Sequence, residues 1–376
     1  MFELAGQLRL ASPEPVYDLS LGNPSLEPPP AWRQAVLELL SNEPDGMHRY
    51  MTNAGFLEVR AFVAAREAAR YGVPFAATDI TMSVGAAGAL NVLAYAMLDP
   101  GDEVIVPAPY FSEYEHYCAT VRATLVPVQS GPEFGLDIDA IARAITPRTR
   151  WLLLNSPNNP TGAVYGSHEL DALAAMLASR RGARPIVVIE DAPYRDLVYD
   201  HGEAPSMLSR YPETIFVTSH SKDLGLAGER IGYLAIAPTA TGRELLTRAM
   251  SYATRVLGFV NAPALMQRVL PRLLEGEGAR VDVSVYARNC RRMAAGLRGL
   301  GFVLPEPQAG FFLFPRLPER LRDADGGDIA LTERLVQERT VVVPGAAFGA
   351  PGYLRLSLAV DEATVDGAIA AFTRAC

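Results

Sequence analysis

The sequence has almost no lysine. Of its 34 basic residues, 33 are arginine and one, Lys222, is lysine. The two residues exchange freely where only a positive charge matters, but a guanidinium stays protonated and cannot act as a nucleophilic amine. Lys222 is therefore a candidate for a covalent bond to a carbonyl compound. Chance survival on a solvated face is the plain alternative.

Cysteine and excess positive charge are also scarce. Cys118, Cys290 and Cys376 form no CxxC pair and no even set, which favours a reducing compartment, and we expect a cytoplasmic protein without a metal site. The formal net charge is -8. Phosphate contacts need clustered cations, so neither nucleic acid nor an anionic membrane is expected as a partner.

No segment is typical of a signal peptide or a membrane span. The N-terminal MFELAGQLRL carries the acid Glu3 and lacks a basic region that leads into an apolar run. The stretch 80–98 is uncharged, but it holds Thr81, Ser83 and Asn91 besides two glycines. We therefore predict a strand, a tight turn and a buried helix there rather than a membrane helix.

The composition and the order of apolar runs predict an α/β protein. With 376 residues and 49% hydrophobic residues, the chain can form two domains around sizeable cores. Strand-like runs that alternate with helical patterns predict a mainly parallel seven-stranded sheet covered on both faces. We expect an N-terminal arm in 1–40, a large domain in 41–278 and a small α+β domain in 279–376 that both termini build. The expected strands are 80–84, 103–107, 124–128, 151–155, 185–190, 214–218 and 231–237, and a long helix is expected over 279–300.

The neighbours of Lys222 strengthen the covalent interpretation. Ser219 and Ser221 precede it at the end of an expected strand, and Arg230 follows eight residues later. Two hydroxyls and a guanidinium beside a nucleophilic amine suit a phosphorylated carbonyl cofactor. The turn SVGAAGAL adds the backbone N–H groups of Gly85, Ala86 and Ala87 at a helix start, where an anion can bind. A small-residue turn for close packing would look the same.

Polar residues also end two further strands. NSPNNPTG carries Asn158 and Asn159, and a plain turn is the simpler explanation. IEDAPY carries Asp191 and Tyr194. A carboxylate at Asp191 could pair with a protonated pyridine nitrogen, although a helix cap explains it equally well.

Together these segments resemble the class I/II aminotransferases, which are fold-type I enzymes that depend on pyridoxal 5'-phosphate (PLP). The resemblance rests on SHSKDLGLAGERIG, NNPTG, DAPY, PAPYFSEY, RYMTNAG, SLGNP and GYLRLSLA, in the family's order and over nearly the whole chain. It implies that Lys222 forms the Schiff base with PLP and that Lys222, Asp191 and Tyr194 are catalytic. The implied cofactor contacts are Tyr50 (from the partner subunit), Gly85, Ala86, Ala87, Phe111, Asn159, Asp191, Tyr194, Ser219, Ser221, Lys222 and Arg230. The implied substrate contacts are Gly22, Asn159 and Arg355, with Arg355 as the clamp for the α-carboxylate.

The sequence departs from the family at several places. Ala86 and Ala87 stand where many relatives have a hydroxyl, so backbone N–H groups must contribute more to an anion site. His220 stands where a tyrosine is common, and we expect a packed neighbour rather than a proton carrier. Arg255 is close to where relatives specific for dicarboxylates present an arginine from the partner subunit, but a surface arginine is an equal alternative.

The resemblance implies a homodimeric aminotransferase that acts on an L-amino acid and a 2-oxo acid. A second interpretation keeps the same scaffold and residues but directs the chemistry to β- or γ-elimination, replacement or C–C bond formation. The motifs do not separate the two. A regulator that senses PLP would need an attached DNA-binding domain, and no helix-turn-helix segment fits before Gly22.

Overall fold

The computed structural model describes residues 2–180, 184–200, 202–275, 281–322 and 326–376. Its largest feature is a seven-stranded sheet with the strand order β2-β8-β7-β6-β5-β3-β4. β8 is antiparallel to both of its neighbours, and the other strands run in one direction. The mainly parallel seven-stranded sheet predicted from the sequence is therefore confirmed. The strands are β2 Ile80–Ser83, β3 Glu103–Ala108, β4 Thr124–Gln129, β5 Thr149–Asn155, β6 Val187–Asp191, β7 Thr214–Ser219 and β8 Gly232–Ile236.

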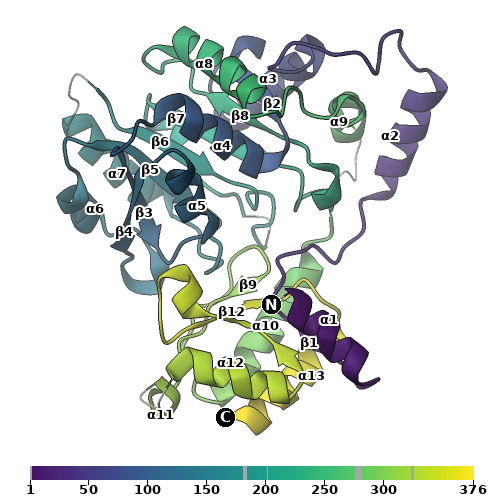
Figure 1. The fold of residues 1–376 in the computed structure, drawn as a ribbon, viewed down its shortest axis with the longest axis vertical. Helices are drawn as coiled ribbons and strands as arrows, with labels where there is room; N and C mark the ends of the chain where they lie inside the picture. The colour runs from purple at the N-terminus through teal and green to yellow at the C-terminus, as the bar shows by residue number, and fades with distance from the viewer. Residues whose placement is uncertain (1, 181–183, 201, 276–280, 323–325) are drawn as a thin grey trace.

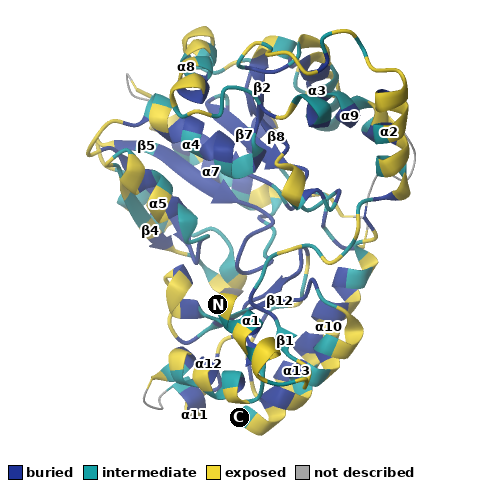
Figure 2. Ribbon diagram, turned by 45° about the vertical axis from the view of Figure 1, so that its right-hand side comes forward, coloured by how far each residue is buried: buried dark blue, intermediate teal, exposed yellow. Residues whose placement is uncertain are grey.

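Both faces of this sheet are covered by helices. Successive residues of β3 point to opposite faces, as the pleat of a strand requires. Val104 and Val106 pack with residues of α4, α5 and α8, while Ile105 packs with residues of α6 and α7. Figure 2 shows these strands as buried between helices that expose their outer faces. The helices of this part are α2 Pro30–Ser41, α3 Leu57–Tyr71, α4 Gly85–Met97, α5 Glu113–Thr120, α6 Ile138–Ala144, α7 Ser167–Ser179, α8 Arg243–Val256 and α9 Ala264–Glu275.

The uncharged stretch 80–98 forms the strand, turn and helix that the sequence predicts. β2 ends at Ser83, and α4 begins at Gly85, whose φ of +75° a residue with a side chain rarely adopts. Within the described part of the chain, no helix combines the length and the apolar character needed to cross a membrane.

The C-terminal third forms a second part, drawn below the large sheet in Figure 1. Its small sheet has the order β11-β12-β9, and β1 near the N-terminus pairs in parallel with β10. Chain segments from both ends therefore meet here, with α1 lying beside β1 and α13 in Figure 1. The elements are α1 Phe2–Ala11, β1 Tyr17–Asp18, α10 Ser284–Gly299, β9 Phe312–Leu313, α11 Glu319–Arg322, α12 Gly327–Gln337, β10 Thr340–Val341, β11 Val343–Pro344, β12 Leu354–Ser357 and α13 Glu362–Ala375.

The helix expected over 279–300 is observed as α10, and positions 279 and 280 lie outside the described residues. The division of the chain at 40 and 278 stays a prediction. Short 3-10 helices complete the inventory: η1 Ala77–Asp79, η2 Pro132–Phe134, η3 Met207–Ser209, η4 Ala227–Glu229 and η5 Gly345–Phe348.

Candidate active site

A cavity of about 370 Å³ lies where the carboxyl ends of the parallel strands meet the second part of the chain. This edge of an open α/β sheet is where such folds bind ligands. The cavity brings together most of the residues singled out from the sequence. They are Gly22, Ala86, Ala87, Phe111, Asn159, Asp191, Tyr194, Ser219, Ser221, Lys222, Arg230 and Arg355.

Lys222 lies in the connection between the antiparallel neighbours β7 and β8. Ser219 and Gly232 pair across the base of this connection, and His220 N donates to Ile231 O at 3.0 Å, so the loop is anchored at both ends. Lys222 Nζ donates to Gly22 O at 2.6 Å.

Burial, together with the positive charges of Arg230 and Arg355, lowers the pKa of Lys222 to about 8. At pH 7 this leaves roughly a tenth of the amine neutral, far more than for an ordinary lysine. The site therefore favours the form of Lys222 that can attack a carbonyl carbon.

One end of the cavity is rich in hydrogen-bond donors. Ser219 Oγ donates to Ser221 Oγ at 3.2 Å, and Arg230 Nη2 donates to Val84 O at 3.4 Å. The first N–H groups of α4 have no acceptor within the helix. A Cβ atom added at Gly85 would lie 2.7 Å from Arg230 Nη2, so glycine is needed to seat the guanidinium against this turn. The donor set suits a phosphate group.

Asp191 ends β6 and is fully enclosed. Its Oδ2 accepts from the Tyr114 hydroxyl at 2.6 Å, while its Oδ1 is buried without a hydrogen-bond partner among the described residues. Burial raises the pKa of Asp191 to about 6, against the opposing effect of the Tyr114 hydrogen bond. A buried acceptor without a partner is costly, so Oδ1 is suited to a donor carried by a ligand.

Asn155 links two of the site segments, and the sequence analysis missed it. Its Nδ2 donates to Asp191 O at 2.8 Å, and its Oδ1 accepts from Asn159 N at 2.7 Å. Its place at the end of β5, opposite Asp191 in the strand register, was the signal that could have identified it.

Arg355 comes from β12 in the second part of the chain. It donates to Ser20 O at 2.5 Å and to Asn159 Oδ1 at 3.4 Å, and its Nε has no partner among the described residues. Its guanidinium lies 5.0 Å from the ring centre of Phe312 and 4.8 Å from that of Phe348. Burial lowers the pKa of Arg355 to about 10, so it stays charged at neutral pH.

Aromatic side chains form the remaining wall. Tyr194 is buried and meets the rings of Phe311 and Phe312 edge-on, each at a centroid distance of 5.7 Å. Phe111 meets Tyr114 edge-on at 5.5 Å. Tyr114 belongs to the quoted segment PAPYFSEY and lies one helical turn after Phe111, so the spacing could have revealed it.

Five residues discussed from the sequence do not line this cavity: Tyr50, Gly85, Asn158, His220 and Arg255. Tyr50 is 90% exposed and borders a separate surface hollow with Phe259 and Ala264. His220 is buried, with Nδ1 at 2.8 Å from Asp223 Oδ2, as expected for a packed neighbour. Arg255 is exposed near the end of α8.

Comparison with known proteins gives a consistent result. The family described as aminotransferase class I and II matches residues 14–372. The aspartate/prephenate aminotransferase of Thermus thermophilus is 32% identical over 367 residues, which cover 95% of this chain and 90% of that protein. A crystal structure of an amino transferase from Eubacterium rectale has a TM-score of 0.92 at 33% identity, covering 100% of this chain and 93% of that one. The Thermus thermophilus aspartate aminotransferase solved with maleate has a TM-score of 0.88 at 30% identity, covering 99% and 94%.

Proposed function

The chain belongs to the class I and II aminotransferases, which move an amino group between an amino acid and a 2-oxo acid, and we propose that its cofactor is pyridoxal 5'-phosphate. The observation that carries this proposal is the buried, unpartnered Oδ1 of Asp191 in the same cavity as the only lysine of the chain. A cofactor with a protonated ring nitrogen supplies the donor that Oδ1 lacks, and a cofactor with an aldehyde supplies a partner for Lys222.

The described residues offer a place for each part of this cofactor. Ser219, Ser221, Arg230 and the first N–H groups of α4 would hold the phosphate, with Tyr50 from a partner subunit. Asp191 would hold the ring nitrogen. Phe111 and Tyr194 of the aromatic wall, and Asn159 of the loop that follows β5, would make further contacts with the cofactor. When bound, PLP supplies an aldehyde that bonds to amines and a ring that draws electrons from the substrate Cα.

In the proposed reaction, the Lys222 amine would hold the cofactor aldehyde. When it is free, Nζ would remove the proton from the substrate Cα, because its lowered pKa lets it act as a base near neutral pH. Asp191 would hold the protonated ring nitrogen through a charge-assisted hydrogen bond. Arg355 binds the substrate α-carboxylate with its planar fork of N–H donors, and Gly22 lies beside the substrate.

We also propose a homodimer in which each Tyr50 completes the phosphate site of the other subunit. The nearly full exposure of Tyr50 supports this proposal, since a large aromatic side chain gains from being covered. Mixing a Tyr50→Phe variant with a Lys222→Ala variant should restore activity in hybrid dimers. No recovery in verified hybrids of two inactive parents would refute the exchange. All three cysteines are free thiols, which supports the cytoplasm as the proposed location.

The covalent role of Lys222 gives the direct test. The purified protein should gain a visible absorption band with PLP, and hydride reduction followed by peptide mass mapping should find the cofactor mass on Lys222. Lys222→Arg keeps the charge but should give no adduct, because a guanidinium stays protonated. An adduct that survives in Lys222→Arg would overturn the assignment.

The transfer reaction itself is measured by the product. One equivalent of 2-oxo acid per site should form from an amino acid when no amino acceptor is present. The names of the relatives point to dicarboxylates such as aspartate as the first substrates to try. Repeated turnover that releases ammonia together with a 2-oxo acid, without an amino acceptor, would instead indicate elimination.

A further inference from the structure

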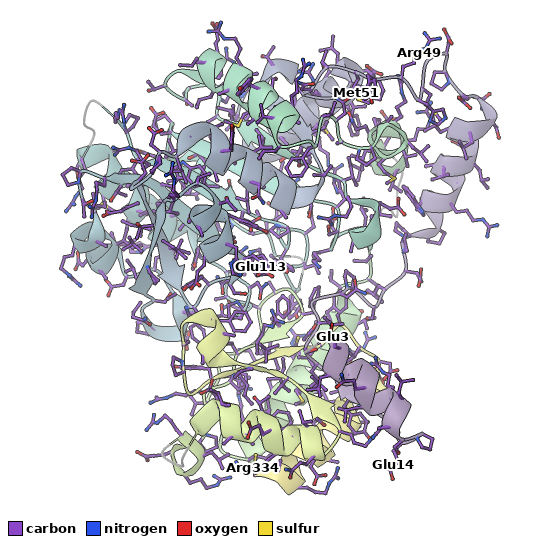
Figure 3. All side chains as sticks on the ribbon, viewed as in Figure 1. Glu3, Glu14, Arg49, Met51, Glu113 and Arg334 are labelled. Atoms are coloured by element: carbon purple, nitrogen blue, oxygen red, sulfur yellow. The ribbon has the colours of Figure 1, made fainter. Side chains whose placement is uncertain are left out.

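The cavity contains a carboxylate that the proposed reaction does not use. Glu113 lines it at the first residue of α5, and its side chain is half-buried. Among the described residues it accepts one side-chain hydrogen bond, from Ser112 Oγ at 3.0 Å, and it takes part in no ion pair. Figure 3 labels Glu113 between the part with the large sheet and the part with the small sheet.

The cations around the cavity all have another role. Among the described lining residues these are Lys222, Arg230 and Arg355. In the proposed function, Lys222 holds the cofactor aldehyde, Arg230 holds the phosphate and Arg355 holds the substrate α-carboxylate. Among the described residues of a single subunit, no lining cation is left for a second carboxylate on the substrate, and such a group would meet the like charge of Glu113.

The surroundings of Glu113 fit a cationic side chain with an apolar stem. Tyr117 and Phe111 line the same wall and offer aromatic faces. A chain of methylene groups can pack on such rings, and a terminal cation is attracted both by the rings and by a carboxylate. Burial of such a pair away from bulk water strengthens the attraction.

We propose that Glu113 selects amino acids whose side chain ends in an ammonium or guanidinium group and disfavours dicarboxylates. This inference rests on the proposed function, because it assigns Arg355 to the α-carboxylate. Glu113 is then a specificity residue that contacts the far end of the substrate. It separates this chain from relatives that are named for aspartate and prephenate.

A different role for Glu113 predicts a different result. Its negative charge also acts on the Arg355 guanidinium, where it opposes the effect of burial. If Glu113 served only to keep Arg355 charged and oriented, its loss would lower kcat/KM for every amino acid by the same factor, because every substrate carries the α-carboxylate. If Glu113 selects by charge, the effect of its substitution on kcat/KM must depend on the side chain of the substrate.

The test compares kcat/KM for lysine, arginine, norleucine and aspartate in the PLP-loaded enzyme. Wild type should prefer lysine and arginine over aspartate. Glu113→Gln should lower kcat/KM for lysine, relative to norleucine, by ~10-fold or more, since a charge-assisted contact is worth at least 1.4 kcal/mol. The same variant should raise kcat/KM for aspartate. Glu333→Gln, an equal charge change on the exposed side of α12, should leave these ratios at the wild-type value.

A binding measurement separates this proposal from the proposed function. Calorimetry with 4-guanidinobutanoate and pentanedioate, which carry no amino group to transfer, should show tighter binding of the guanidinium compound. Glu113→Gln should reverse or abolish that order. An unchanged lysine-to-norleucine ratio, an equal loss for all four amino acids, or unchanged binding of both analogues would overturn the role of Glu113. If no amino acid formed an oxo acid, the proposed function would be refuted. Binding of the two analogues would still test whether Glu113 selects by charge.

Discussion

Replacing Tyr114 with phenylalanine removes one hydroxyl from the site and should impair the enzyme through Asp191. The Tyr114 hydroxyl donates to Asp191 Oδ2 at 2.6 Å, and it is the only hydrogen-bond partner of that carboxylate among the described residues. The hydrogen bond stabilises the ionised form of Asp191. Without it, the buried carboxyl group has a stronger tendency to keep its proton.

The size of the effect follows from the strength of such a bond. A hydrogen bond to a charged group contributes about 1.5–3 kcal/mol, which corresponds to roughly one to two pKa units. The pKa of Asp191, which burial has already raised to about 6, therefore moves to or above neutral pH in the variant. A protonated Asp191 cannot pair with a protonated ring nitrogen. Because the shift lowers the ionised fraction of Asp191 at pH 7 from roughly nine tenths to between a half and a tenth, kcat/KM at pH 7 should fall by roughly 2- to 10-fold.

The pH profile distinguishes this mechanism from a packing defect. Raising the pH ionises Asp191 again, so the acidic limb of kcat/KM against pH should move upward by roughly one to two units in Tyr114→Phe. PLP affinity, measured by its visible absorption, should fall in parallel. Tyr110→Phe is the matched control, because its hydroxyl also donates to a carboxylate, Glu115, that does not line the cavity. Equal losses in both variants, or a loss independent of pH, would refute the reasoning.

Three further predictions follow from buried contacts. Gly85→Ala should weaken PLP binding, measured by absorption titration, because the new Cβ would lie 2.7 Å from Arg230 Nη2 and must displace it. Gly22→Ala should raise KM for the amino acid, because its Cβ would lie 2.8 Å from Phe312 Cζ in the cavity wall. Burial raises the pKa of Glu190 from 4.5 to about 7, so the free energy of unfolding should fall as the pH rises through that window. Glu190→Gln should flatten that part of the urea-unfolding profile, and an unchanged slope would contradict the burial argument.

The central strands of the sheet could be predicted because they are buried on both faces. A run such as WLLLN in β5 has no polar face and no helical period, so a central strand is its natural environment. The reversed direction of β8 was not predicted. The connection from β7 to β8 carries only the short helix η4, too little for a parallel crossover, and this spacing was visible in the sequence.

Site residues at the ends of strands could be predicted from the sequence. Site residues on helices could not, because the packing of the helix decides where their side chains point. Asp191 ends its strand, so its position at the sheet edge follows from the topology alone. Glu113 and Tyr114 stand at the start of α5, and only the packing of that helix decides that both reach the cavity. The role proposed for Tyr50 requires a partner subunit, so it stays a prediction.

The single lysine among 33 arginines is explained if only one basic side chain has to lose its proton. Lys222 and Arg355 line one cavity, and burial is the main cause that lowers the pKa of each. The lysine starts at 10.5 and reaches about 8, whereas the arginine starts at 12.5 and reaches about 10. The same environment therefore gives a usable fraction of neutral amine at position 222 but leaves a guanidinium charged. Arginine suffices at the other 33 basic positions if they require only charge and hydrogen bonds, and it would fail at position 222 if that group acts as the proposed nucleophile.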